Sequence, residues 1–157
     1  MSTIYVRPGE GRHNPMIDGD HIAKAAVQDA DGAFEVFESI APAAPMAHPH
    51  ISPWTSVLFL LEGRITAVVG GTSYDVEPGG VVVFPAGTSA TFGVVGESAR
   101  FVAVTSGDGA GRFFADFVSS VPADQPAEDS MAAILSVTSR HGVTLADVRI
   151  DRPWIKD

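Results

Sequence analysis

Short apolar runs separated by turn residues make up the chain from about residue 22 to residue 105. Such spacing is typical of an all-β sandwich or barrel, because each strand buries one face and the chain then reverses direction. The pattern predicts strands over residues 21–27, 33–39, 56–61, 64–69, 72–76, 80–84, 90–95 and 100–105. Glycine-containing turns are predicted between them, among others at Glu62-Gly63, Gly96-Glu97 and, most clearly, the Gly70-Gly71 hairpin.

Within two of the predicted strands, residues 57–61 and 81–84 are apolar at every position instead of alternating. Such strands are covered on both faces, one by the barrel interior and the other by a further layer or subunit. Val57, Phe59 and Leu61 are expected to point away from the interior. We therefore predict a homodimer that covers these side chains.

The pattern changes to a helical period after Gly111. Residues 112–119 carry three phenylalanines at helical spacing, and residues 126–141 form a second amphipathic segment. Pro126 suits a first helical turn, and Gly142 suits the position just after a helix. With no internal repeat, the chain is predicted to be one domain over residues 1–157, with a barrel at about 20–106 and a helical appendage at about 110–142.

Composition excludes several classes of function. The 157 residues carry a formal net charge of −9, which repels phosphate backbones and anionic lipid, so we expect neither nucleic acid nor membrane as a partner. The chain has no cysteine and therefore no disulfide, thiolate ligand or thiol nucleophile. The first 25 residues lack the apolar segment of a signal peptide, and a cytoplasmic location is expected.

The segment His48-Pro49-His50 is the sharpest candidate for chemistry. Two imidazoles at strand spacing point to the same face and can reach one centre. Such a pair can supply half of a metal's ligands. It can equally be ordinary polar filling, so the motif alone leaves both interpretations open.

Further motifs surround this pair: a Leu-Glu-Gly turn at 61–63, Glu-Pro-Gly at 77–79, Pro-Ala-Gly at 85–87 and an N-terminal Pro-Gly-Glu-Gly at 8–11. With them the chain resembles the cupin superfamily, and in particular small single-domain cupins of the quercetin-dioxygenase-like kind. The resemblance covers about residues 7–148. It implies a cupin jelly-roll β-barrel with two short C-terminal helices, an active site in the barrel lumen and pairing into dimers.

The chain departs from the pattern of metal-binding cupins at two ligand positions. The glutamate position of the first motif, counted back from Gly63, falls on Ser56, and the histidine position of the second falls on Ala90. Two neutral imidazoles without a carboxylate supply too few ligands for a divalent ion. We therefore expect no bound metal and no cofactor. His21, on the first predicted strand, is the candidate for restoring a ligand.

The same departures predict a pocket. By analogy with the family, Ser56 and Ala90 leave space in the lumen for an apolar organic ligand beside His48 and His50. Trp54 fits either the lumen or its rim, and Lys24 is a reserve candidate for catalysis. The remaining predicted lining is Leu58, Leu60 and Phe92.

Three functions remain open. The first is a metal-independent enzyme that isomerises, dehydrates or cyclises a small, fairly apolar substrate such as a secondary metabolite, with His50 or His48 as general acid or base. The second is a metal-dependent quercetinase-like dioxygenase with an unusual ligand set. The third is a non-catalytic module that binds a small molecule.

Overall fold

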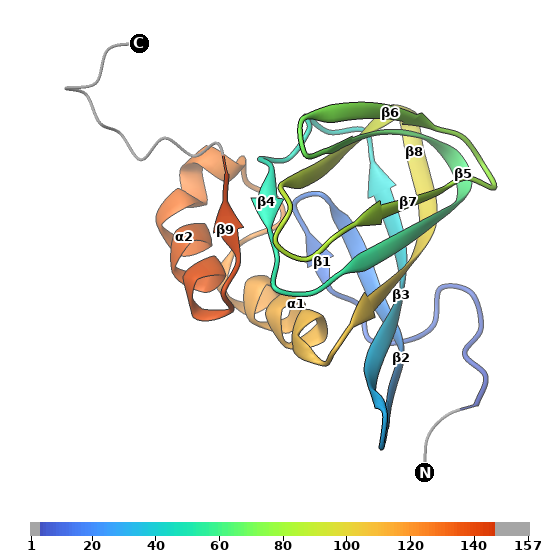
Figure 1. Ribbon diagram of the computed structural model, residues 1–157. Helices are drawn as coiled ribbons and strands as arrows, with labels where there is room; N and C mark the ends of the chain where they lie inside the picture. Colours follow the sequence, from blue (N-terminus) through green and yellow to red (C-terminus); the bar gives the residue numbers. More distant parts are fainter. Residues whose placement is uncertain (1–3, 147–157) are drawn as a thin grey trace.

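The structure of the protein is a computed structural model that describes residues 4–146 (Figure 1). Strands dominate it, and the two helices follow the last long strand. The strands are β1 Pro15–Met16, β2 Gly19–Asp29, β3 Gly32–Pro42, β4 His50–Ile51, β5 Ser56–Val69, β6 Thr72–Val76, β7 Val81–Phe84, β8 Ala90–Ser106 and β9 Thr144–Leu145. The helical elements are α1 Gly109–Ser120, a 3-10 turn at Ala127–Ser130, and α2 Met131–Arg140.

Strands β5 and β8 are the longest, and they pair antiparallel along almost their whole length, from Ser56 opposite Thr105 to Val69 opposite Ala90. The first half of β5 also pairs with β7 and its second half with β6, while the second half of β8 pairs with β3. The sheet curls round on itself as a result (Figure 1). This is the all-β jelly-roll architecture that the sequence predicts.

Two predicted turns are wrong. At Glu62-Gly63 and Gly96-Glu97 the chain does not reverse, because β5 and β8 each continue through the position as one strand. The register of β5 against β8 shifts on both sides of Glu62, which marks a β-bulge, and bulges bend a strand without ending it. Gly63 has a φ of 80°, and a Cβ there would collide with the carbonyl oxygen of Ser98. Glycine is needed at this position because the backbone of β8 passes close to it within the bent strand.

Other predicted elements are confirmed. Strand β6 has the predicted bounds, and Gly70 and Gly71 form the predicted hairpin turn with φ values of 57° and 84°. Helix α1 begins three residues before its predicted start, and α2 is followed by Gly142 with a φ of 70°. The two-residue strands β1, β4 and β9 were not predicted, since such short segments have no recognisable period.

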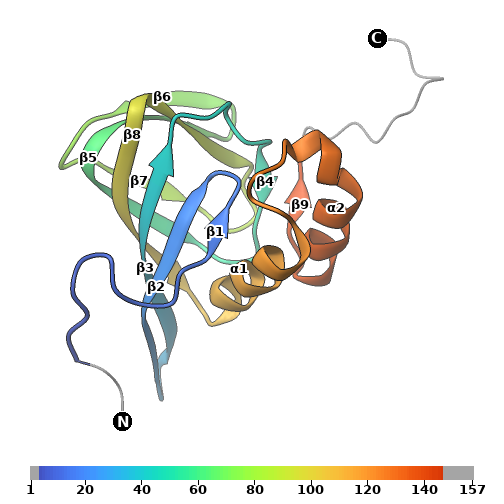
Figure 2. The same ribbon diagram turned by 180° about the vertical axis from the view of Figure 1, so that it is seen from behind.

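The helices pack together at one end of the barrel (Figure 2). Asp116 of α1 accepts hydrogen bonds from the Arg140 guanidinium at 3.1 Å and lies 2.8 Å from the His141 ring, which ties the end of α2 to α1. On the inner side, Phe113 and Phe117 of α1 join the hydrophobic core of the barrel. The helices therefore close one end of the barrel. Among the described residues, neither helix is long and apolar enough to span a membrane.

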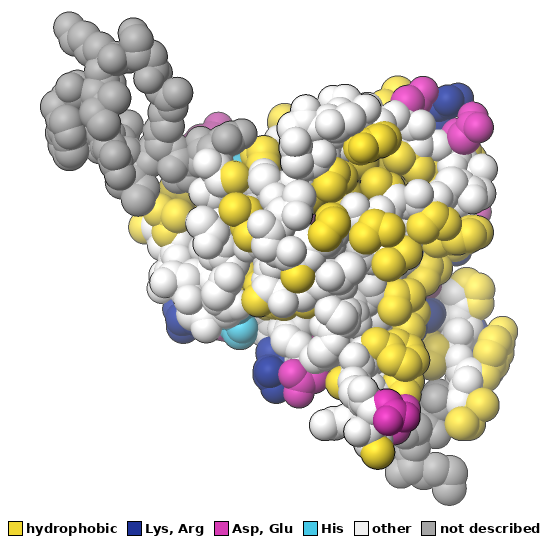
Figure 3. All heavy atoms as spheres, viewed as in Figure 1, with side chains coloured by type: hydrophobic (Ala, Val, Ile, Leu, Met, Phe, Trp, Pro, Cys, Tyr) yellow, Lys and Arg dark blue, Asp and Glu magenta, His cyan; other side chains and the backbone are white. Residues whose placement is uncertain are grey.

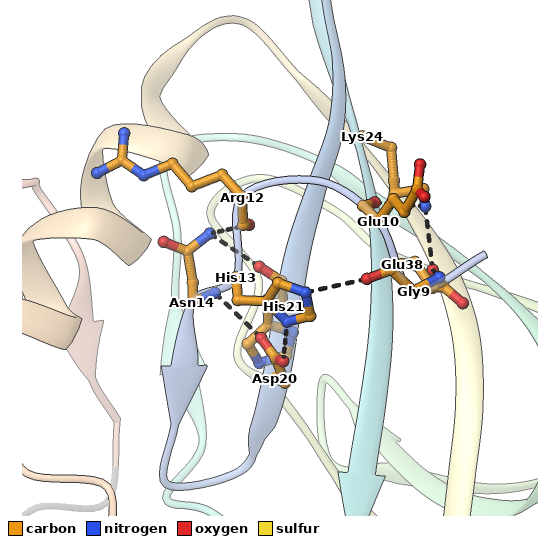
Figure 4. A network of polar contacts seen from close by, with 9 residues as sticks. All are labelled: Gly9, Glu10, Arg12, His13, Asn14, Asp20, His21, Lys24 and Glu38. Carbon is orange, nitrogen blue, oxygen red and sulfur yellow. Dashed lines mark hydrogen bonds and ion pairs between the residues drawn. The ribbon is translucent and has the colours of Figure 1, made fainter. Parts of the chain in front are cut away.

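The N-terminal residues lie against the outer side of β2 and β3 (Figure 4). The buried Glu38 carboxylate accepts a hydrogen bond from the Gly9 N–H at 2.8 Å and forms ion pairs with Lys24 and Arg100. His13 bridges the Asp20 carboxylate and the Gly9 carbonyl oxygen. These contacts fix the N-terminal segment to the barrel wall.

An outer apolar face, defined here as Phe34, Val57, Phe59, Val81, Val83 and Val104, crosses β3, β8, β5 and β7. The exposed fractions of Phe59, Val81 and Val83 are 43%, 54% and 44%. Val57 lies opposite Val83 on one side and Val104 on the other, so the residues form neighbouring rows. Figure 3 shows a band of apolar side chains on this side of the molecule. Exposed apolar patches of this kind mark interaction surfaces.

The homodimer remains a prediction, and Phe59 tests it. We expect Phe59→Lys to convert a dimer into a monomer, because a lysine at the centre of the outer apolar face would have to lose its hydration in the interface. Light scattering at micromolar concentration measures the mass. Tyr74→Lys is the matched control, since Tyr74 is 49% exposed and lies outside this face. A monomeric wild-type protein would contradict the prediction.

Candidate active site in the barrel lumen

A cavity of about 80 Å³ lies inside the barrel and is covered at one end by α1. Its polar lining comes from the β1–β2 turn and from five strands or their flanking loops, and its apolar lining is mainly aromatic. The polar residues are Asp18, His21, Ser39, His50, Ser52, Ser56, Thr88 and Thr105. The apolar residues are Phe37, Trp54, Leu58, Phe84, Pro85, Ala90, Phe92, Phe101, Ala103, Phe113 and Phe114.

A larger space of about 590 Å³ lies outside the barrel, beside the bulge of β5. It is an open surface groove, and its two arginines, Arg64 and Arg100, are already paired with carboxylates. It contains no histidine. The lumen is therefore the better candidate for chemistry, although it is the smaller space.

Asp18, His21 and Ser39 form a hydrogen-bonded chain in the cavity wall. His21 of β2 lies opposite Ser39 of β3 in the strand register, and Asp18 precedes β2 in the turn from β1. The His21 Nδ1 lies 2.7 Å from the Ser39 Oγ, and its Nε2 lies 2.9 Å from the Asp18 Oδ1. Phe114 of α1 stacks on the His21 ring with centroids 5.0 Å apart. Both ring nitrogens of His21 are therefore hydrogen-bonded, and one face of the ring packs against Phe114.

The pKa values of the two histidines of the cavity are shifted in opposite directions. Burial disfavours the charged form of His21, but the adjacent Asp18 outweighs burial and raises the pKa of His21 above 6.5. Burial also opposes ionisation of Asp18, yet His21 lowers the pKa of Asp18 below its usual value. For His50 burial is the larger effect: it outweighs the raising effect of Asp18 and lowers the pKa of the imidazole below 6.5. These shifts favour the charged forms of Asp18 and His21 and the neutral form of His50.

Most of the predicted pocket residues line this cavity. His50, Trp54, Ser56, Leu58, Ala90 and Phe92 all do so. Leu60 does not: it faces the interior but is 1% exposed and packs deeper in the core.

His48 also lies outside the cavity lining, as an exposed residue. Strand β4 begins only at His50, so the two-residue period that would place both imidazoles on one face does not extend back to His48.

Lys24 lies on the outer side of the barrel. The register of β2 against β3 shifts between Ala23 and Ala25, and Lys24 occupies this bulge. Its Nζ donates to the Glu10 carbonyl oxygen at 2.6 Å and pairs with Glu38 at 3.2 Å (Figure 4). Lys24 therefore does not fit the reserve role in catalysis, because it lies outside the cavity lining and anchors the N-terminal segment.

Asp18, Ser39 and Thr105 are cavity residues that the sequence patterns did not identify. Ser39 follows Phe37 by two positions, so strand alternation could have placed it in the lumen once Phe37 was known to point inward. Asp18 lies in a turn, where no period applies. Helix α1 was predicted, but nothing in its pattern indicates that its phenylalanines cover the cavity.

The side chains in the lumen do not fit a divalent metal ion. His21, the candidate for restoring a ligand, has both ring nitrogens engaged, and Ser56 and Ala90 bring neither an imidazole nor a carboxylate to the lining. Within residues 4–146, no group of three or more histidine and carboxylate side chains is placed to hold an ion. We derive no step of the chemistry through a metal.

We expect the purified protein to contain much less than one equivalent of iron, zinc, manganese or nickel, because too few ligands converge in the lumen. Elemental analysis of protein prepared without added metal measures this. One metal ion per chain, together with inhibition by a chelator and recovery when the metal is returned, would contradict the expectation.

Comparison with known proteins agrees with this curled, all-β architecture. Residues 36–105 match the family model of the cupin domain. The matched segment is 70 of the 157 residues. No curated protein matches the chain.

Several solved structures resemble the fold at low sequence identity. The polyketide cyclase RemF from Streptomyces resistomycificus has a TM-score of 0.57 at 20% identity, over 68% of this chain and 80% of RemF. The plu4264 protein from Photorhabdus luminescens has a TM-score of 0.55 at 12% identity, over 73% and 96%. KdgF from Halomonas sp. has a TM-score of 0.52 at 13% identity, over 58% and 80%. These likenesses show a common fold.

Proposed function

We propose that the chain is an enzyme that moves protons on a small organic molecule in the barrel lumen, without a metal ion. Isomerisation, dehydration and ring closure are reactions of this type. One observation carries the proposal: His21 and His50 line the same cavity, and their pKa values are displaced in opposite directions. Two titratable groups whose pKa values are shifted in opposite directions are suited to act as acid and base at the same pH.

His50 is the proposed base. Its imidazole is neutral because burial disfavours the cation, so a ring nitrogen can accept a proton from a bound molecule. The residue lies at the start of β4, opposite Ala90 in the register, and the small Ala90 side chain leaves room beside it. His50 thus meets the two requirements of a base, the correct protonation state and access to the ligand.

His21 supplies the acid through Ser39. Protonated His21 donates one hydrogen to Asp18 and the other to the Ser39 Oγ. The Ser39 hydroxyl then accepts from a cation and can donate its own hydrogen to a ligand oxygen. A hydrogen bond from a hydroxyl polarised in this way stabilises negative charge on that oxygen while His50 removes a proton elsewhere. Asp18 favours the protonated form of His21 and fixes the orientation of its ring.

The size of the cavity restricts the substrate. A volume of about 80 Å³ is well below the roughly 300 Å³ at which pockets for drug-sized ligands begin. The likeness to RemF is a likeness of fold and does not extend to the size of the substrate. Aromatic and aliphatic walls favour a small and fairly apolar molecule.

The remaining alternatives differ in what they require. A dioxygenase of the quercetinase type needs a metal that the lumen residues do not fit. A non-catalytic module that binds a small molecule needs the cavity but no base, and so it is separated from an enzyme by the effect of removing His50.

Proton transfer can be measured before the product is known. We expect wild-type protein in heavy water to introduce deuterium at a carbon of at least one member of a pool of small neutral ketones, detected by NMR. The His50→Ala variant should exchange about a hundredfold more slowly, as is typical when a positioned base is lost. His48→Ala is the matched control and should exchange at the wild-type rate, since His48 is outside the cavity.

Ala90→Phe provides the complementary variant. It should abolish both binding and exchange while the protein stays folded, because the larger side chain would fill the cavity. Exchange that survives in His50→Ala would overturn the proposed base. Binding with no exchange in the wild-type protein would favour the non-catalytic module.

The rate of exchange should depend on pH in a bell-shaped manner. His50 must be deprotonated, so the rate rises with pH through its lowered pKa, on the acid side of 6.5. His21 must be protonated, so the rate falls through its raised pKa, on the alkaline side of 6.5. Asp18→Asn should move both limbs to lower pH, because Asp18 raises the pKa of His21 through a hydrogen bond and its charge, and that of His50 through its charge alone. A profile with one limb only would contradict the two-histidine assignment.

A further inference from the structure

Thr105 has an unpaired hydroxyl group in the cavity wall. The residue is 2% exposed, and its Oγ1 is the buried side-chain polar atom that has no hydrogen-bond partner within residues 4–146. Strand alternation places its side chain in the lumen with Ala103, and both line the cavity. A hydroxyl removed from water without a partner destabilises a protein, so such groups point to a missing partner.

The hydroxyl lies far from the proposed acid. Thr105 is opposite Ser56 in the register of β5 and β8, whereas Ser39 is opposite Phe101 in the register of β3 and β8. The four residues from Phe101 to Thr105 correspond to about 13 Å along a strand. The row between them is apolar and consists of Phe37, Ala103 and Leu58. The cavity wall is thus polar at both ends and apolar in the middle.

The lining also restricts the charge of a ligand. Its ionised groups are Asp18 and His21, which pair with each other at 2.9 Å, and neither lysine nor arginine lines the cavity. A carboxylate or an ammonium group on the ligand would therefore enter without a counter-charge.

We propose that Thr105 binds the substrate at the end remote from the imidazoles, and that the substrate is a small, elongated, uncharged molecule with an oxygen function near each end. This rests on the proposed function for the position of the reacting end. One oxygen meets the Ser39 hydroxyl and the other meets Thr105. The two hydroxyl positions are about 13 Å apart along the strand, and a hydrogen bond of about 2.8 Å is formed at each end. The two ligand oxygens are therefore about 7 Å apart. A narrow chain suits the cavity volume of about 80 Å³ better than a ring system does.

Thr91 is a natural control on the same strand. It is also 2% exposed, but its hydroxyl donates to the Ala47 carbonyl oxygen at 2.7 Å. Replacing Thr91 by valine removes a formed hydrogen bond and leaves the Ala47 oxygen without that donor. Replacing Thr105 by valine removes a hydroxyl that has no partner. We therefore expect Thr91→Val to lower the Tm of the free protein by several degrees, and Thr105→Val to leave it unchanged or raise it.

Binding is measured with two probes that differ in one hydroxyl group. They are a straight five-carbon diol with a hydroxyl at each end and the corresponding five-carbon alcohol with a single hydroxyl. NMR titration of the wild-type protein should show tighter binding of the diol. Thr105→Val should weaken diol binding about tenfold and remove the preference over the alcohol. Thr105→Ser, which keeps a hydroxyl, and Thr91→Val should both retain the preference.

The proposal is overturned if the wild-type protein does not bind the diol or binds both probes equally. It is also overturned if Thr105→Val binds the diol as the wild type does, or loses as much Tm as Thr91→Val. Failure of the proposed function is a separate result. Absence of deuterium exchange with the diol preference intact would remove the catalytic role and support Thr105 as the anchor of a binding cavity.

Discussion

The pairing of β5 with β8 is the constraint on which the rest of the molecule depends. Each strand belongs to both halves of the curled sheet, and the bulge near Glu62 lets β5 bend while its ladder with β8 continues. The bend requires Gly63, because the backbone of Ser98 comes too close for a side chain. The same two strands supply Ser56, Leu58, Ala90 and Thr105 to the cavity, so the shape of the lumen follows from the register of this one pair.

Hydrophobic patterning could predict the fold but not the continuity of its strands. Alternation and glycine turns indicated an all-β sandwich or barrel, the resemblance to cupins implied the jelly-roll barrel, and the phenylalanine spacing indicated α1. The errors at Glu62-Gly63 and Gly96-Glu97 share one physical cause. Glycine permits a turn and also permits a close approach inside a strand, and only the partner strand decides between the two. A sequence without its pairing carries no information about that partner.

Only part of the site could be predicted, because a periodic pattern gives a direction to side chains on long strands but not to those in turns or very short strands. Residues that alternate along long strands, such as Ser56, Leu58, Ala90 and Phe92, could be placed by their period together with the analogy to the cupin family. His48 could not, because the strand that would give it a direction begins two residues later, at His50. Asp18 enters from a turn, and its effect on His21 depends on a contact between side chains. The electrostatic difference between the two histidines, on which the proposed chemistry depends, is therefore a property of the tertiary structure alone.

The ion pair of Asp18 and His21 has a consequence for how molecules reach the lumen. The chain carries a net charge of −9, and its field repels anions from the whole surface. Within the cavity the two opposite charges cancel, so the interior offers anions no compensating attraction. An uncharged molecule experiences neither effect. Its rate of entry is accordingly set by diffusion and by the opening of the barrel, and is independent of ionic strength.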